Sequence, residues 1–262
     1  PVATAALVAA AARAFVLDAG PVFSHAGAMS FTPWHLLACA AVGVLAGLGS
    51  GVLTSLVYAA EDLFEKLPLH WMWWPAIGGV VVGLGGLIDA HVLGAGYSNI
   101  QGLLDGSLAM RVVLALLAVK AIVWLVALGS GTSGGVLAPL LILGGALGVL
   151  VGQFLPGPTG LWAMAGMAGI MSGAMRAPLT GALFAVELTG HFDALPATIA
   201  ASAGAYAISV LIMRRSILTE KIARRGRHVL QEYTVDPLEF LQAGQVTLKQ
   251  TCQEGSPPGA VC

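Results

Sequence analysis

Charged residues are scarce in this 262-residue chain, because Asp, Glu, Lys and Arg together make up only 10% of it. A soluble domain usually carries about 25%. Hydrophobic residues make up 57% of the chain and its mean hydropathy is +0.86, so water is not its main solvent. The net charge of −1 also excludes a general nucleic-acid binder, since no excess of Lys and Arg is available to neutralise a phosphate backbone.

Cysteine is sparse too, and three cysteines do not make a disulfide framework. Cys39 lies in an apolar run, whereas Cys252 and Cys262 lie in a polar tail. This distribution favours reduced, incidental thiols.

The middle of the chain has no charged side chain between Lys120 and Arg176. A membrane-spanning helix needs about 20 apolar residues, so at least two spans fit there. Strands of a membrane barrel would alternate apolar and polar residues, but runs such as Val112–Leu128 are apolar on every face. The sequence therefore predicts an all-α, polytopic membrane protein.

Basic residues gather near the C-terminal end of the chain. Six of the 12 Lys and Arg lie close together there: Arg214, Arg215, Lys221, Arg224, Arg225 and Arg227. By the positive-inside rule this end is cytoplasmic. We expect a multi-pass integral protein of the cell (inner) membrane with its C-terminus in the cytoplasm.

Helices of very uneven length are predicted along the chain, at 2–17, 34–61, 74–88, 97–104, 109–128, 136–154, 161–174, 178–190, 195–213 and 217–225. Several are shorter than the hydrocarbon core, and Gly and Pro separate them, as at 129–135 and 156–160. Non-helical backbone at membrane depth is tolerated only where protein buries it or water reaches it. Broken, partly spanning helices that surround a ligand pathway are therefore expected.

Glycines recur at four-residue spacing, a pattern that lets helices approach each other closely in lipid. They occur at Gly43, Gly47 and Gly51, at Gly79 and Gly83, at Gly144 and Gly148, and at Gly169 and Gly173. The pattern favours packing between helices of one chain, with a subunit interface as the alternative.

The most informative segment is Gly129–Pro139, a polar turn that leads into an apolar helix. The first turn of a helix has unpaired N–H groups and about half a positive charge, which attract an anion without Lys or Arg. Gly134 and Gly135 let an ion approach the backbone, and Pro139 fits an early helical position. Partial charges suit a transport pathway, since a permeating ion must also leave its site.

Other interpretations of this turn fit the residues less well. A nucleotide-binding loop would place Gly-Lys-Ser or Gly-Lys-Thr before the helix, where this chain has Gly135, Val136 and Leu137. A serine nucleophile would need a His and a carboxylate nearby, but His91 and His191 lie at predicted membrane edges. We expect no enzyme activity, no catalytic residue and no metal site, while a purely structural hinge stays open.

Three charged residues lie in apolar surroundings: Lys120, Arg176 and Glu187. Intramembrane charges are functional candidates by default. We interpret Arg176 and Glu187 as structural residues near helix ends. Lys120 is interpreted as a snorkelling or paired lysine, with electrostatic attraction of anions as the alternative.

The segment Gly129–Pro139, followed by Leu140–Gly148, resembles the Gly-Ser-Gly…Gly-Gly-x-Phe-Ala-Pro signature of the CLC chloride channel and proton/chloride antiporter family. Further matches appear in the family's order and spacing: Gly94–Tyr97 with Ile100 and Gln101, Lys120, Met175–Gly181, Val186–Gly190 and Ser216–Gly226. Together they cover roughly Val2–Gly226 and resemble the second half of the family's membrane domain.

The resemblance implies an anion-binding site at Gly134, Gly135, Val136 and Leu137, where the backbone amides of Val136 and Leu137 bind chloride. Leu137 replaces the family's usual Phe, a change that retains the amide but alters the shape of the pore. Leu218 stands where the family commonly has a Tyr whose hydroxyl contacts the same ion. Weaker chloride binding or looser coupling is therefore expected.

The resemblance also implies the second half of a CLC-type inverted-repeat fold and a homodimer in the lipid bilayer, with one pathway per subunit. The dimer interface would come from the first helices and from Pro178–Met213. Chloride is the expected transported ligand, with protons in antiporter members, and no cofactor is expected. Channel and antiporter both stay open.

Several parts of the family's pathway are not found in this sequence: the Gly-Ser-Gly-x-Pro loop, the Gly-Arg-Glu-Gly-Pro loop with its gating glutamate, and the internal proton glutamate. No basic leader follows Pro1, and no internal repeat is found. We therefore expect a fragment that lacks its gate and does not transport by itself.

Two regions are predicted, a partial CLC-type transmembrane domain at 1–226 and a cytoplasmic tail or linker at 227–262 without a complete CBS domain. Two other function classes stay open. One is a non-transporting dimerisation or interaction module, and the other is a broken-helix transporter for an organic anion.

Overall fold

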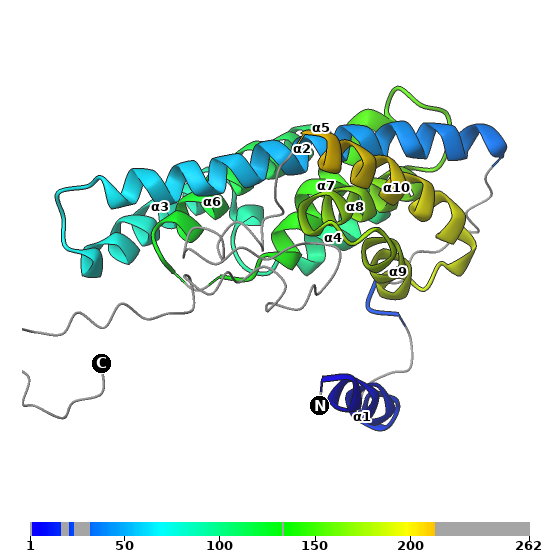
Figure 1. The fold of residues 1–262 in the computed structure, drawn as a ribbon, viewed down its shortest axis with the longest axis horizontal. Coiled ribbons are helices and arrows are strands. Elements are labelled where there is room, and N and C mark those ends of the chain that lie inside the picture. The colour runs from blue at the N-terminus through cyan, green and yellow to red at the C-terminus, as the bar shows by residue number, and fades with distance from the viewer. Residues whose placement is uncertain (1, 17–20, 24–31, 133, 213–262) are drawn as a thin grey trace, which may run out of the picture. The chain divides into compact units, whose positions relative to one another are not determined.

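The computed structural model describes residues 2–16, 21–23, 32–132 and 134–212 (Figure 1). Every regular element in these residues is a helix. The α-helices are α1 Val2–Val16, α2 Pro33–Glu65, α3 Trp74–Ile88, α4 Tyr97–Leu104, α5 Met110–Ala115, α6 Ala121–Gly129, α7 Leu137–Gly152, α8 Thr159–Met175, α9 Pro178–Thr189 and α10 Leu195–Ile212. Short 3-10 turns lie at Trp71–Trp73, Ala90–Val92 and Phe192–Ala194, and a π-helical turn at Leu116–Lys120 joins α5 to α6.

Four helical segments of the described residues are long and apolar enough to cross a membrane: Pro33–Glu65, Trp71–Ile88, Met110–Gly129 and Phe192–Ile212. Other apolar helices are too short. The 16 residues of α7 extend about 24 Å, less than the ~30 Å hydrocarbon core, and α9 has only 12 residues. The expected polytopic, all-helical fold with partly spanning helices is confirmed.

The breaks between α8, α9 and α10 arise at a glycine, a proline and one arginine whose backbone has left-handed helical angles. Helix α8 ends at Met175, and its C-cap residue Arg176 has φ 56° and ψ 38°. Pro178 then begins α9 at a position where its missing N–H costs little. Helix α9 ends at Gly190, whose φ of 72° reverses the chain. These two turns separate the apolar helices α8, α9 and α10, which would otherwise follow one another without a break.

The core of the described fold is α8. All residues from Gly160 to Ala174 are buried, because α2, α7, α9 and α10 pack around this helix (Figure 1). Helix α2 in turn lies against α6 and α10, and α3 lies against α6. Trp162, Met164 and Met167 fill the space between α8 and its neighbours.

Small residues allow the closest helix contacts. A Cβ at Gly148 of α7 would overlap the carbonyl oxygen of Trp162 in α8, and a Cβ at Gly43 of α2 would overlap the carbonyl oxygen of Ala201 in α10. Packing within one chain is therefore confirmed at these glycines. A Cβ at Gly79 or Gly83 of α3 would meet nothing within 4 Å in the described part of the chain.

Two predicted helices differ most from the structure. The helix expected at 109–128 contains the π-helical turn Leu116–Lys120, and the helix expected to end at residue 61 continues to Glu65. The helix expected at 217–225, the basic cluster and the boundary between 226 and 227 lie outside the described residues and stay predictions.

Candidate functional site

The predicted anion site lies where the chain enters α7. Val136 is the N-cap residue, with φ −94° and ψ −33°, and Leu137 is the first helical residue. Gly134 and Gly135 precede it and are exposed, and the Leu137 side chain is 42% exposed. The four predicted residues are consecutive, so the structure brings them together at one helix end.

The amides of Val136 and Leu137 have no backbone acceptor in the part of the chain that the structure describes. The first N–H groups of a helix lack intrahelical partners, and their partial positive charge favours an anion. Because Lys and Arg are absent from 121–175, no charged side chain within these residues contributes to this charge. The arrangement suits weak, reversible binding of a small anion.

The two hydroxyl groups that the structure describes in the preceding turn, those of Ser130 and Thr132, are already engaged. The Ser130 Oγ donates to the carbonyl oxygen of Ala127 at 2.8 Å, and the Thr132 Oγ1 donates to the same oxygen. Gly131 has φ 79°, which lets the chain leave α6 after this contact. Among the described groups of the turn, the amides are thus the donors left for a ligand.

Trp124 of α6 contacts this turn. The sequence alone does not predict this contact. The Trp124 indole Nε1 donates a hydrogen bond to the carbonyl oxygen of Gly135 at 3.4 Å. The side chain is 6% exposed and belongs to a buried cluster with Leu140 and Leu143 of α7. A tryptophan inside an apolar helix is the one sequence signal for such a contact, since a buried indole N–H usually finds a hydrogen-bond partner.

Lys120 is buried and does not snorkel. Its Nζ donates to the carbonyl oxygens of Val92 at 2.8 Å and Gly94 at 2.9 Å, and the residue is 5% exposed. The loop that it holds leads to Gly96, which caps α4 at φ 72° and packs against Ile142 of α7. Lys120 therefore fixes a loop beside α7, and of the two predicted roles the paired lysine is the one observed.

The other predicted residues are Arg176, Glu187 and Leu218. Arg176 is the C-cap residue of α8, and Glu187 is on the exposed side of α9, as expected for residues near helix ends. Leu218 lies outside the described residues. Within the described ranges, no three His, Cys, Asp or Glu side chains gather as they would around a metal ion.

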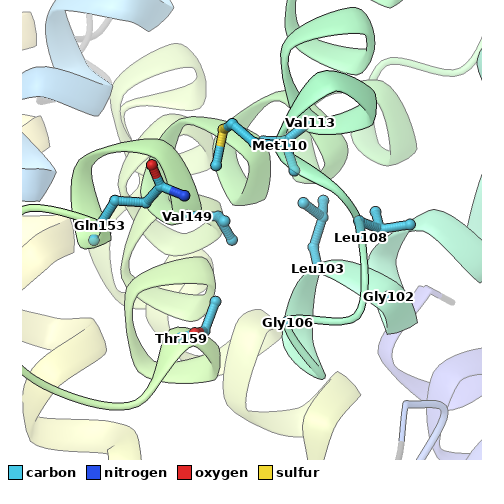
Figure 2. Close-up of a pocket in the computed structure, with 10 residues that line it drawn as sticks. Gly102, Leu103, Gly106, Leu108, Met110, Val113, Val149, Gln153 and Thr159 are labelled. Atoms are coloured by element: carbon cyan, nitrogen blue, oxygen red, sulfur yellow. The ribbon is translucent and has the colours of Figure 1, made fainter.

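A cavity of about 140 Å³ lies at the other end of α7 (Figure 2). Val149 and Gly152 of α7 and the C-cap residue Gln153 line it together with residues of α4, α5 and α8. Val149 is thirteen residues beyond Val136, which is about 20 Å along a helix. The cavity is therefore separate from the predicted anion site.

Comparisons with known proteins agree on one family. Residues 1–210 match the family described as voltage gated chloride channel. A curated relative, the voltage-gated ClC-type chloride channel ClcB of Escherichia coli, is 33% identical over 195 residues, which cover 70% of this chain and 46% of that protein.

Two solved structures are also similar. A slow cyanobacterial Cl⁻/H⁺ antiporter has a TM-score of 0.70 at 20% identity, covering 78% of this chain and 50% of that one. A CLC-type fluoride/proton antiporter has a TM-score of 0.63 at 20% identity, covering 71% of this chain and 47% of that one. The chain thus spans about half the length of the proteins it matches.

Proposed function

Because the chain belongs to the CLC family of voltage-gated chloride channels, we propose that it forms part of a chloride transport pathway across a membrane. The anion is held by the backbone amides of Val136 and Leu137, with Gly134 and Gly135 leaving the approach open. No covalent bond of a substrate changes in this process, and no cofactor takes part.

One observation carries this proposal: two amides at the start of a partly spanning helix have no described backbone acceptor. The first N–H groups of a helix have no intrahelical acceptor, so a ligand that accepts from both amides is favoured there. Chloride fits because it accepts hydrogen bonds from all sides. The same two amides would bind fluoride, the ion named for one of the similar structures.

The chain alone is proposed to bind the anion without transporting it. It spans about half of its relatives' length, and the remaining half would supply the gating groups.

We also propose a homodimer, with Leu183 of α9 and Ile199 and Val210 of α10 in the interface, since these apolar side chains are 52%, 41% and 45% exposed. Its C-terminus would lie in the cytoplasm.

The test is chloride efflux from liposomes that contain the chain, with and without the first membrane half of a CLC protein. We expect efflux only when both halves are present, and proton counterflow would identify an antiporter. Efflux by the chain alone would contradict the fragment proposal. Calorimetric titration of the detergent-solubilised chain should show chloride binding.

Two other outcomes of the titration would identify the alternative functions. Displacement of chloride by a small carboxylate at a lower concentration would favour an organic anion as the substrate. A stable dimer that binds no halide at all would favour a dimerisation module.

A further inference from the structure

The contact between Trp124 and Gly135 involves the peptide group that also carries the Val136 amide. The carbonyl oxygen of Gly135 accepts the indole hydrogen bond at 3.4 Å, and the N–H of Val136 belongs to the same peptide unit. A peptide unit is planar, and the described residues contain no cis peptide bond. In a trans unit the C=O and the N–H point in opposite directions.

This geometry determines where the Val136 N–H points. When Trp124 holds the Gly135 oxygen, the Val136 hydrogen points away from Trp124 and from the buried cluster around it. A glycine-rich turn has many accessible backbone conformations, so without this contact the peptide plane would rotate more freely. The indole therefore restricts the orientation of one of the two proposed anion donors.

Trp124 is itself well fixed. It is 6% exposed and packs in one cluster with Leu140 and Leu143 of α7 and Val57 of α2. The Val136 side chain packs against the same cluster. The indole, the turn and the first residues of α7 thus form a single packed unit.

We propose that Trp124 is a positioning residue for anion binding: its indole N–H orients the Gly135–Val136 peptide so that the Val136 amide faces the ion. This inference rests on the proposed anion site at Val136 and Leu137. Anion binding and the indole hydrogen bond reinforce each other, because polarising one end of a peptide unit strengthens hydrogen bonding at its other end.

The chain contains a matched control in Trp162 of α8. Trp162 is 1% exposed, and its Nε1 has no partner among the described groups. Replacing either tryptophan by phenylalanine removes an indole N–H and leaves a smaller aromatic ring. Only the substitution of Trp124 removes a hydrogen bond to the anion turn.

The first experiment is calorimetric chloride titration of the full chain in detergent, as wild type, Trp124→Phe and Trp162→Phe. We expect chloride binding about five-fold weaker in Trp124→Phe, the size expected for one lost hydrogen bond. Trp162→Phe should bind like wild type even if its thermal stability falls. Wild-type affinity in Trp124→Phe would overturn the inference alone, whereas no binding by the wild type would overturn the anion site as well.

The second experiment uses the wild-type chain, so no substitution can disturb the packing of its core. In the wild-type chain labelled with ¹⁵N-tryptophan, chloride addition should shift the indole N–H resonance of Trp124 and leave that of Trp162 in place. Gluconate at equal ionic strength should shift neither. A Trp124 resonance that does not respond while calorimetry shows chloride binding would refute the positioning role and leave the anion site intact.

Discussion

The contact between α7 and α8 predicts a large cost for a single methyl group at Gly148. In a Gly148→Ala variant the new Cβ would overlap the Trp162 carbonyl oxygen and lie 2.9 Å from the carbonyl carbon of the same residue. Real Cβ atoms essentially never come within 3.0 Å of another heavy atom. The atoms concerned are backbone, so α7 and α8 must move apart, and overpacking of this kind costs about 1–3 kcal/mol.

Gly83→Ala in α3 is the matched comparison, because a Cβ there meets nothing within 4 Å of the described structure. Both variants gain the same helix propensity, about 1 kcal/mol in favour of Ala, so their difference isolates the packing cost. We expect Gly148→Ala to be about 1–3 kcal/mol less stable than Gly83→Ala in denaturant titrations followed by tryptophan fluorescence. Equal stability would show that α7 and α8 do not approach as closely as described.

Three further substitutions test other parts of the structure. Lys120→Met leaves two backbone carbonyls without their buried donor and should lower the free energy of unfolding by about 1–3 kcal/mol. A variant as stable as wild type in the same titration would show that Lys120 does not fix the loop at Val92 and Gly94. Hydrogen bonds from the backbone amide and ring of His91 hold the pKa of the Asp89 carboxyl below its usual 3.8. The stabilisation that the ionised Asp89 carboxylate gains from these bonds is therefore complete above about pH 4 and is lost as the pH falls through the lowered pKa. Asp89→Asn should flatten the acid side of a pH–stability profile, and an unchanged profile would show that Asp89 does not contribute to acid stability. Leu137→Phe should change chloride affinity less than two-fold by calorimetry, because the proposed contact uses the amide and the side chain is 42% exposed; a larger change would assign the side chain a direct part.

Much of the fold could be predicted from local signals. The bounds of α3 and α4 match the predicted 74–88 and 97–104, because glycine-rich and polar segments separate these apolar stretches. The sequence predicts the end of α2 four residues early, at Glu61, because a charged last turn interrupts the apolar pattern without ending the helix. The π-helical turn before α6 leaves no such local signal, because four of its five residues are as apolar as those of the neighbouring helices and the fifth, Lys120, does not distinguish a π-helical turn from an α-helix.

The sequence also predicts that Gly134, Gly135, Val136 and Leu137 lie together at the start of a helix, since they are consecutive, and the structure places them there. What supports the site could not be predicted. Trp124 contacts a residue eleven positions away, and the partners of Lys120 lie 26 and 28 positions away. Such contacts depend on how α6 packs against the turn and the loop, which no local pattern encodes.

The proposed function depends on the binding of a halide by the amides of Val136 and Leu137. Bromide replaces chloride in most halide sites and scatters X-rays anomalously, so crystals of the protein grown in bromide would show the ion directly. We predict an anomalous peak within hydrogen-bond distance of both amide nitrogens at the start of α7. A bromide peak elsewhere in the chain, with these two amides bonded to protein carbonyls, would contradict the proposed function.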